Sequence, residues 1–252
     1  MSFDVAADAY DRFMGRYSTL LSPQLADLAG VRGGQRVLDV GCGPGALTAE
    51  LVRRLGPASV AAVDPSAPFV AAARARNPGV NVLHASAERL PFPDHAFDAA
   101  LAQLVVHLMS DPVAGLAEMA RVTRRDGVVT ACVWDYGGGT GPLGAFWQAA
   151  RELDPEVDDE SQRAGTREGH LAELFEAAGL HDIQATALSV SLEHSSFEEW
   201  WEPFTGGVGP AGSHVASLDA EAQAELRERC RAQLPTAPFV ITARAWATRG
   251  LA

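Results

Sequence analysis

The sequence predicts an α/β domain in which a mostly parallel β-sheet is covered by helices on both faces. Three observations support this prediction. Short apolar strands alternate with helical segments, the strands are continuously apolar, and a glycine-rich turn joins the first strand to a helix. The chain has 252 residues, 47% of them hydrophobic and 21% charged, which is enough for a sizeable core. We expect a single domain over residues 1–252.

The first half of the chain contains the alternation. Aromatic and aliphatic side chains recur at helical spacing over residues 3–30. Ser22-Pro23 predicts the start of a second helix, with proline at its first position, and Gly33-Gly34 predicts its end. Beyond it, the apolar runs predict strands at 37–40, 60–63, 80–83, 97–104 and 128–134, and the segments between them predict helices at 46–55, 67–76 and 112–125.

The glycine-rich run 137–142 interrupts this rhythm. The remaining third is expected to complete the sheet and to add a small cap. Its predicted elements are helices at 143–153, 167–178, 196–202 and 219–233 and strands at 181–192 and 239–247. The acidic segment 154–160 is expected to be a solvated loop.

Composition excludes several classes of function. The chain has 32 acidic and 20 basic residues, a formal charge of −12, which argues against nucleic acid or an anionic membrane as a partner. Every basic residue is arginine, so no lysine is present for a Schiff base, a pyridoxal phosphate anchor or a P-loop.

The three cysteines, Cys42, Cys132 and Cys230, are far apart in the sequence. They predict no disulfide framework and no zinc site, and they fit a reducing cytoplasm. No basic segment followed by an apolar run suggests a signal peptide, and no apolar stretch reaches the ~18 residues of a membrane span. We therefore expect a cytoplasmic protein without a membrane span.

The turn after the first strand contains the strongest site signal. Gly41, Gly43 and Gly45 allow a tight turn and let a ligand lie against the backbone at the start of the next helix. Asp64 ends the second strand 23 residues after Gly41, where a carboxylate can accept both hydroxyl protons of a ribose. Asp64 also suits the N-terminal cap of the next helix. These features alone would equally fit a dinucleotide site, because Gly41-x-Gly43-x-x-Ala46 matches that fingerprint.

Two details favour a different nucleoside. Asp39 lies within the first strand, and Gly45 adds a third glycine, so the run Asp-x-Gly-x-Gly-x-Gly resembles motif I of class I S-adenosylmethionine (SAM)-dependent methyltransferases. The similarity is greatest to the bacterial small-molecule group that includes relatives of ubiquinone and sterol methyltransferases. Segments 85–94, 97–100 and 116–127 resemble later parts of the same family, so the resemblance covers about residues 8–136.

The resemblance implies a Rossmann-like fold with a seven-stranded, mostly parallel sheet. Its last strand, 239–247, would be antiparallel and would lie beside the fifth. In this scheme residues 1–30 cover the cofactor, 31–136 bind SAM, and 137–252 complete the sheet and cap the substrate. The product of the cofactor would be S-adenosylhomocysteine (SAH).

The resemblance also implies roles for individual residues. Asp39, Gly41, Cys42 and Gly43 would line the methionine part of SAM. Asp64 would hold the ribose hydroxyls. The adenine would lie beside Pro65, Ser66, Ser86, Ala87 and Glu88.

Ser86 is a departure, because the family commonly has an aspartate there that accepts a bond from the adenine amino group. Glu88 is the candidate to replace that aspartate. Gln103 and Leu104 would lie under the sulfonium.

The N-terminal segment resembles the helix that covers the cofactor in this family. Arg16 is the candidate partner for the carboxylate of SAM, and Tyr10 and Tyr17 are candidates to face its sulfonium. The alternative is an amphipathic helix that packs these aromatic residues on the core.

On the acceptor side, His107 is the candidate general base, because it follows the fourth strand where the methyl group should emerge. Trp134 and Tyr136 end the fifth strand at the same edge of the sheet. Trp200 and Trp201, followed by the glycine-rich segment 205–210, are candidates for a hinged lid over an apolar acceptor. Packing in the core is the alternative for each of these side chains.

Together these features predict methyl transfer from SAM to a small-molecule acceptor, by a monomer or homodimer and without a metal ion. Two alternatives remain open. An NAD(P)-dependent oxidoreductase would use the same turn, although no Tyr-x-x-x-Lys pair is present. A SAM-binding protein that has lost catalysis would explain Ser86. A nucleic-acid methyltransferase is disfavoured by the charge.

Overall fold

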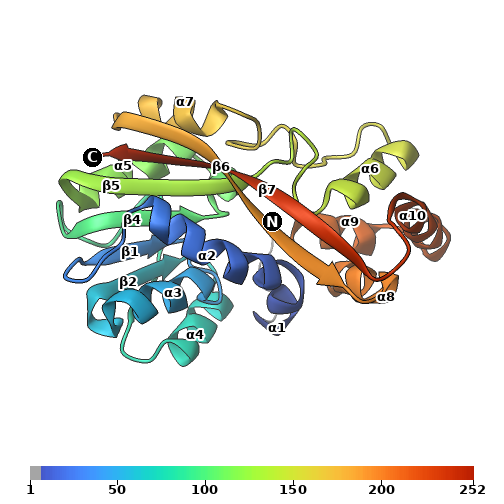
Figure 1. Ribbon diagram of the computed structural model, residues 1–252, viewed down its shortest axis with the longest axis horizontal. Helices are drawn as coiled ribbons and strands as arrows, with labels where there is room; N and C mark the ends of the chain where they lie inside the picture. The colour runs from blue at the N-terminus through green and yellow to red at the C-terminus, as the bar shows by residue number, and fades with distance from the viewer. Residues whose placement is uncertain (1–6) are drawn as a thin grey trace.

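The computed structural model describes residues 7–252, in which a single β-sheet of seven strands is flanked by helices (Figure 1). The strand order is β3-β2-β1-β4-β5-β7-β6. The first five strands are mutually parallel, and β7 is antiparallel to both β5 and β6. The strands are β1 (Val37–Val40), β2 (Val60–Asp64), β3 (Asn81–His84), β4 (Phe97–Gln103), β5 (Thr123–Trp134), β6 (His181–His194) and β7 (Phe239–Leu251). The predicted fold class, with an antiparallel last strand beside the fifth, is confirmed.

Helices cover both faces of this sheet. The helical segments are α1 (Ala7–Tyr10), η1 (Asp11–Gly15), α2 (Arg16–Leu28), α3 (Ala46–Leu55), η2 (Pro57–Ser59), α4 (Ala67–Arg76), η3 (Val106–Leu108), α5 (Pro112–Val122), α6 (Gly144–Leu153), α7 (His170–Ala177), α8 (Phe197–Trp201), η4 (Glu202–Gly206), α9 (Gly209–Ser217) and α10 (Ala220–Gln233). Apolar side chains of α2, α3 and α4 pack on one face, and those of α5 and α7 on the other. β1 and β2 are therefore buried on both sides, which explains their continuously apolar sequences.

The N-terminal helices differ from the prediction. Segments α1, η1 and α2 follow one another without a break, and Pro23 lies inside α2, so the prediction of a new helix at Ser22-Pro23 is wrong. Leu21 and Leu25, on either side of Pro23, are fully buried, and their packing outweighs the backbone hydrogen bond that proline cannot donate. The helix ends before Gly30, which has a φ of +65°, and not at Gly33-Gly34. Residues 3–6 of the predicted helix lie outside the described residues.

The boundary between α5 and β5 also lies earlier than predicted. The helix expected over 112–125 ends at Val122, and the strand begins at Thr123. The Thr123 hydroxyl donates to the carbonyl oxygen of Met119 at 2.7 Å, and Thr123 pairs with Phe97 of β4. Pairing with a neighbouring strand decides the conformation here, and the sequence does not show it. At the other end of the chain, β7 continues to Leu251, beyond the predicted limit at residue 247.

A cap formed by α6, η4 and α8–α10 lies near the carboxyl ends of the parallel strands (Figure 1). Its buried side chains, among them Phe146, Trp200 and Phe204, belong to the same apolar cluster as Leu21 of α2 and Trp134 of β5. The cap is thus packed onto the sheet through a continuous core. Within residues 7–252, no helix is both long enough and apolar enough to cross a membrane.

Candidate functional site

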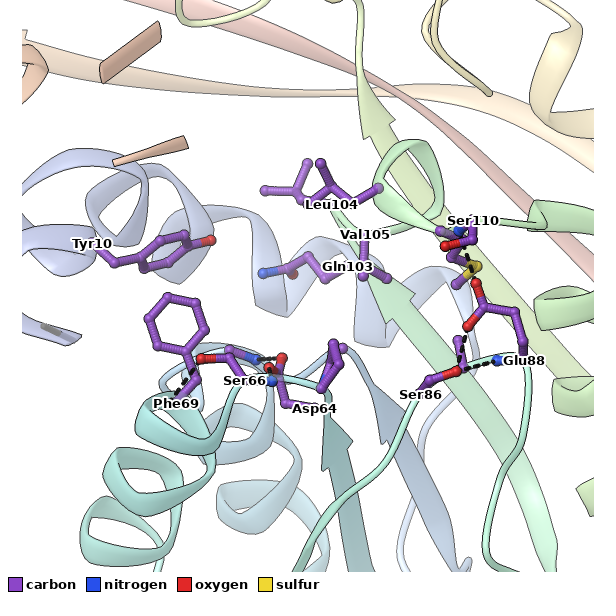
Figure 2. Close-up of a pocket in the computed structure, with 16 residues that line it drawn as sticks. Tyr10, Asp64, Ser66, Phe69, Ser86, Glu88, Gln103, Leu104, Val105 and Ser110 are labelled. Atoms are coloured by element: carbon purple, nitrogen blue, oxygen red, sulfur yellow. Dashed lines mark hydrogen bonds between the residues drawn. The ribbon is translucent and has the colours of Figure 1, made fainter. Parts of the chain in front are cut away.

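A cavity of about 290 Å³ lies at the carboxyl ends of β1, β2 and β4. Figure 2 shows it between Tyr10 and Phe69 on one side and Ser86 and Glu88 on the other. Most of the residues predicted to bind a cofactor line it, namely Tyr10, Gly41, Gly43, Asp64, Pro65, Ser66, Ser86, Ala87, Glu88, Gln103 and Leu104. Segments that are far apart in sequence therefore meet where open α/β sheets bind ligands.

Gly41 shapes the floor of this cavity. Its φ is +71°, and an added Cβ would lie 2.4 Å from a Val105 methyl carbon, so no larger residue fits. The N–H groups of Gly41 and Cys42 both donate to the carbonyl oxygen of Val63, each at 2.9 Å. These bonds hold the turn after β1 against the end of β2.

Asp64 is fixed at the end of β2 by two backbone N–H groups. Its Oδ2 accepts from Gly43 at 2.8 Å and its Oδ1 from Ser66 at 2.8 Å. Burial raises the pKa of Asp64, although these two hydrogen bonds act in the opposite direction. Each carboxylate oxygen keeps a second lone pair for a hydroxyl donor. The geometry suits a ligand with two adjacent hydroxyl groups.

The opposite wall is built around Glu88. The Ser86 hydroxyl donates to Glu88 Oε2, and the Ser110 N–H donates to Glu88 Oε1 at 2.8 Å. Burial alone would raise the pKa of Glu88, but these hydrogen bonds outweigh it and lower the pKa. Glu88 therefore joins the loop after β3 to the segment before α5 and carries a negative charge at the cavity wall.

Comparison with known proteins shows which proteins this chain resembles. Residues 38–131 match a family model described as a methyltransferase domain. A demethylmenaquinone methyltransferase of Beutenbergia cavernae is 40% identical over 101 residues, which cover 40% of this chain and 41% of that protein. A malonyl-[acyl-carrier protein] O-methyltransferase of Serratia marcescens is 33% identical over 148 residues, 56% of this chain and 57% of that protein.

The chain thus spans about half the length of the curated relatives that it matches. A crystal structure of geranyl diphosphate C-methyltransferase from Streptomyces coelicolor, in complex with SAH, shares the fold with a TM-score of 0.56 at 14% identity, covering 94% of this chain and 80% of that one.

Residues 38–131 thus belong to a methyltransferase domain, and the fold of the chain is that of class I SAM-dependent methyltransferases.

The residues present at this site fit SAM, the cofactor of the matched family. Asp64 offers paired acceptors for ribose hydroxyls, and Gly41 leaves bare backbone for close approach. Two buried oxygens near this end of the sheet, Asp39 Oδ1 and Gln103 Oε1, have no hydrogen-bond partner among the described residues. Unpaired buried acceptors are costly, and a ligand ammonium group or a bridging water would satisfy them.

Four of the predicted cofactor residues do not line this cavity. Asp39 is 1% exposed and accepts a hydrogen bond from Thr48, and Cys42 is buried beneath the turn. Arg16 pairs with Glu199 at 2.8 Å, and Tyr17 forms a hydrogen bond with His194 at 3.1 Å. The structure therefore places Arg16 and Tyr17 at the contact between α2 and the cap, and it buries Asp39 within β1 and Cys42 in the turn after β1.

Sequence reasoning missed five of the residues that line the cofactor cavity: Phe69, Val105, Leu108, Met109 and Ser110. Phe69 lies among the apolar residues of a predicted helix, where an aromatic side chain predicts packing in the core. It meets Tyr10 edge-to-face with ring centroids 5.4 Å apart. The other four follow β4 directly, and their position after a strand of a parallel sheet was the available signal.

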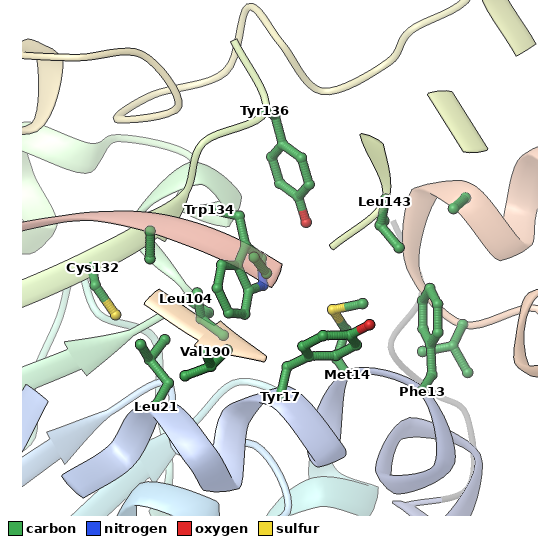
Figure 3. Close-up of a cluster of buried hydrophobic side chains, with 14 of the residues drawn as sticks. Phe13, Met14, Tyr17, Leu21, Leu104, Cys132, Trp134, Tyr136, Leu143 and Val190 are labelled. Atoms are coloured by element: carbon green, nitrogen blue, oxygen red, sulfur yellow. The ribbon is translucent and has the colours of Figure 1, made fainter. Parts of the chain in front are cut away.

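A second, smaller cavity of about 60 Å³ adjoins the first. The predicted acceptor residues His107, Trp134 and Tyr136 line it, and Tyr10, Leu104 and Leu108 line both cavities. Leu104 has a left-handed φ of +60° at the end of β4, a strained conformation that typically marks functional sites. Figure 3 shows Trp134 and Tyr136 opposite Phe13 and Met14 of the N-terminal helices.

His107, the predicted general base, lines this second cavity and is 9% exposed. Burial, together with the charge of Arg163, lowers the pKa of His107 to about 3. Its ring is neutral at physiological pH and is a weak proton acceptor. Its centroid lies 5.8 Å from that of Tyr136, edge-to-face.

Trp200 and Trp201 are buried in the cap and line neither of these two cavities. Trp201 packs against Phe197 and Phe204, and Trp200 also packs against Phe204. The glycine-rich segment after them closes one side of the second cavity through residues 208–211. The aromatic residues thus support the segment that was predicted to be a lid, whereas residues 208–211 form its inner surface.

Proposed function

We propose that this protein transfers the methyl group of SAM to a small, largely apolar acceptor held in the second cavity. The observation that supports the proposal is that the two cavities share part of their lining. Tyr10, Leu104 and Leu108 contribute to both, so the cavities adjoin and ligands in them would meet at the boundary that these side chains line. Transfer by in-line displacement requires such proximity and the exclusion of water.

In this mechanism the protein binds SAM and the acceptor, orients them and encloses them. SAM supplies a methyl group activated by a positively charged sulfur. Asp64 accepts hydrogen bonds from the ribose, and the turn at Gly41 leaves room for the methionine portion. Leu104 and the aromatic side chains of the second cavity exclude water from the point of transfer.

The proposal of an apolar acceptor rests on the residues that line the second cavity. Phe13, Met14, Leu143 and Val208 are buried and apolar, and they favour a hydrophobic molecule over a sugar or a peptide. The two curated relatives carry different acceptors in their names, a demethylated menaquinone and a protein-bound malonyl group. An apolar small molecule fits this cavity better than a charged one.

Calorimetric titration with SAM, SAH and NADH tests the cofactor. We expect both adenosyl ligands to bind, and we expect Asp64→Asn to weaken them about 10- to 100-fold, since a neutral amide replaces a charged acceptor. The matched control is Asp126→Asn, an exposed aspartate whose side chain is 79% accessible. Binding of NADH without binding of SAH would overturn the proposal in favour of an oxidoreductase.

A further inference from the structure

The second cavity contains three buried polar atoms without a partner. Glu160 Oε2, His107 Nδ1 and Trp134 Nε1 have no hydrogen-bond partner in the part of the chain that the structure describes. All three side chains line the cavity, and they are 2%, 9% and 1% exposed, respectively. Native proteins rarely leave one such group unsatisfied, and three at one cavity indicate a site that a polar ligand completes.

Glu160 was expected to lie in a solvated acidic loop, and that expectation is wrong. The segment between α6 and α7 turns inward at Glu160, whose left-handed φ of +67° is unusual for a residue with a side chain. The Arg163 N–H donates to the Glu160 carbonyl oxygen at 3.1 Å. The buried Thr166 hydroxyl lies 2.8 Å from the carbonyl oxygens of Ser161 and Arg163. These bonds hold the backbone that directs the carboxyl group inward.

The charged groups around Glu160 compensate the negative charge of its carboxylate only in part. Arg163 Nη1 lies 3.5 Å from Oε1, and Asp158 and Asp159 are on the same loop. Across from the loop, the Trp147 indole of α6 lowers the pKa of Glu160, although its Nε1 forms no hydrogen bond of normal geometry with a described residue.

Tyr136 interacts electrostatically with Glu160 and Arg163, His107 interacts with Arg163, and Arg151 of α6 pairs with Asp159. Burial prevails over these opposing effects and raises the pKa of Glu160 to about 7.

We propose that Glu160 binds the acceptor by accepting a hydrogen bond, and then the proton, from an acidic hydroxyl group on an apolar ring or chain, a phenol or an enol. This inference rests on the proposed function, because it assigns the acceptor to the second cavity. The cavity geometry supports it: one unpaired carboxylate oxygen lies among aromatic and aliphatic walls. Glu160 would then perform the proton-accepting role that the sequence suggested for His107.

The proton balance of this step is complete. The O–H bond of the acceptor breaks, its proton passes to Glu160 Oε2, and the electron pair left on oxygen forms the bond to the methyl carbon. The carbon–sulfur bond breaks with its electron pair remaining on sulfur, so a cation and a carboxylate become two neutral groups. Glu160 then releases the proton to water after the product leaves.

A hydroxyl acceptor fits Glu160 better than an amine does. An alkylammonium group would pair tightly with the carboxylate, but its nitrogen has no free lone pair while it is protonated. A phenol has a similar pKa, near 10, but its oxygen keeps a lone pair while it donates its proton to the carboxylate. The proton can therefore pass to Glu160 as the methyl carbon bonds to that oxygen, which is general base catalysis.

The test is a binding cycle with two probes that differ in one proton, 4-fluorophenol and its methyl ether, 4-fluoroanisole. Fluorine NMR measures both affinities with saturating SAH, so methyl transfer is not required. We expect the wild type to prefer the phenol, and Glu160→Gln to reduce this preference about tenfold, the loss of one hydrogen bond to a charged acceptor. The wild-type preference should also increase as the pH rises through about 7, where Glu160 ionises.

Controls separate the possible failures. Glu156→Gln changes an exposed acid of the same loop and should leave the preference unaltered. SAH affinity should be the same in Glu160→Gln, because Glu160 does not line the cofactor cavity. An equal preference in wild type and Glu160→Gln, or no binding of either probe to the SAH complex, would overturn the inference while leaving the cofactor intact. Absence of SAH binding to the wild type would instead overturn the proposed function. If Glu160→Gln does not fold, a pH-independent preference in the wild type overturns the inference.

Discussion

Asp39 shows the cost to a fold of burying a carboxyl group that has a single hydrogen-bond donor. Its carboxyl group is 1% exposed inside β1, with one hydrogen bond from Thr48 at 2.6 Å and no salt bridge within residues 7–252. Burial, with a smaller contribution from nearby Asp64, raises the pKa of Asp39 to about 7. The free protein therefore disfavours the charged form that a cationic ligand would favour.

The pH dependence of stability should reveal this cost. Because the folded-state pKa of Asp39 lies above the usual 3.8, its stabilising contribution is complete below about pH 4 and is lost as the pH rises through 7. We expect Asp39→Asn to gain about 2 kcal/mol in free energy of unfolding over the wild type between pH 5 and pH 8. Urea denaturation at both pH values measures this, with Asp126→Asn as control. If the difference in free energy of unfolding between Asp39→Asn and the wild type is the same at both pH values, this prediction is wrong.

Single residues also mark the limit of sequence reasoning. The glycines after β1 and Asp64 were predictable because backbone freedom and a carboxylate at a strand end act locally. Glu160 was not, because its burial depends on the loop folding back over Tyr136, with the Gly137 N–H donating to the carbonyl oxygen of Thr166 at 2.9 Å. In the sequence it is one of several adjacent acids, which normally face water.

At the level of elements, α2 is unusual because Pro23 lies inside it. A proline inside a helix removes one backbone hydrogen bond and costs about 3 kcal/mol against alanine. The carbonyl oxygen of Pro23 accepts from Arg54 at 3.0 Å, and Ser22 donates its hydroxyl to Ser18 at 2.7 Å. These contacts keep the helix continuous without restoring the missing donor.

Replacing this proline should stabilise the protein. Pro23→Ala restores the N–H donor, and we expect a gain of about 1–2 kcal/mol after the greater entropy of the unfolded chain is subtracted. In a chain of this size that corresponds to a rise in Tm of about 2–8 °C. Scanning calorimetry measures it. Pro112→Ala, at the first position of α5 where proline is well tolerated, should give no gain. No change in Tm for Pro23→Ala would show that the helix is not strained by the proline.

Elements within the parallel half were predictable, and their ends were less so. Apolar runs of four or five residues located β1 and β2 closely. The boundary at Thr123 depends on pairing with Phe97, and the continuity of α2 depends on Leu21 and Leu25 packing on the sheet. Both are contacts between distant segments, which a local pattern does not contain.

At the level of the whole molecule, one apolar cluster extends from α2 and β5 into the cap. A ligand that binds the folded chain and not the unfolded chain therefore stabilises it as a unit. SAH at a hundred times its Kd should add about 2.7 kcal/mol, a rise in Tm of about 5–10 °C. Thermal denaturation with SAH and with NADH measures this, and Asp64→Asn is the control that should lose the SAH shift. An equal shift with NADH would contradict a site built for SAM.

The order of the strands could not be worked out from periodicity. Alternating strands and helices predicted a parallel sheet, but the position of β7 beside β5 followed only from the family resemblance. The packing of the cap could not be predicted from periodicity either. Phe204 stacks on Phe146 with ring centroids 4.6 Å apart, although almost sixty residues separate them in the sequence. Residues on short turns that line the first cavity were predictable, whereas Leu143 and Glu160, which line the second cavity, were not.

Tyr10, Leu104 and Leu108 line both cavities. This shared lining has a thermodynamic consequence. An occupant on one side restricts the positions these side chains can take toward the other. The two dissociation constants are therefore linked, and by reciprocity each ligand must change the affinity of the other by the same factor.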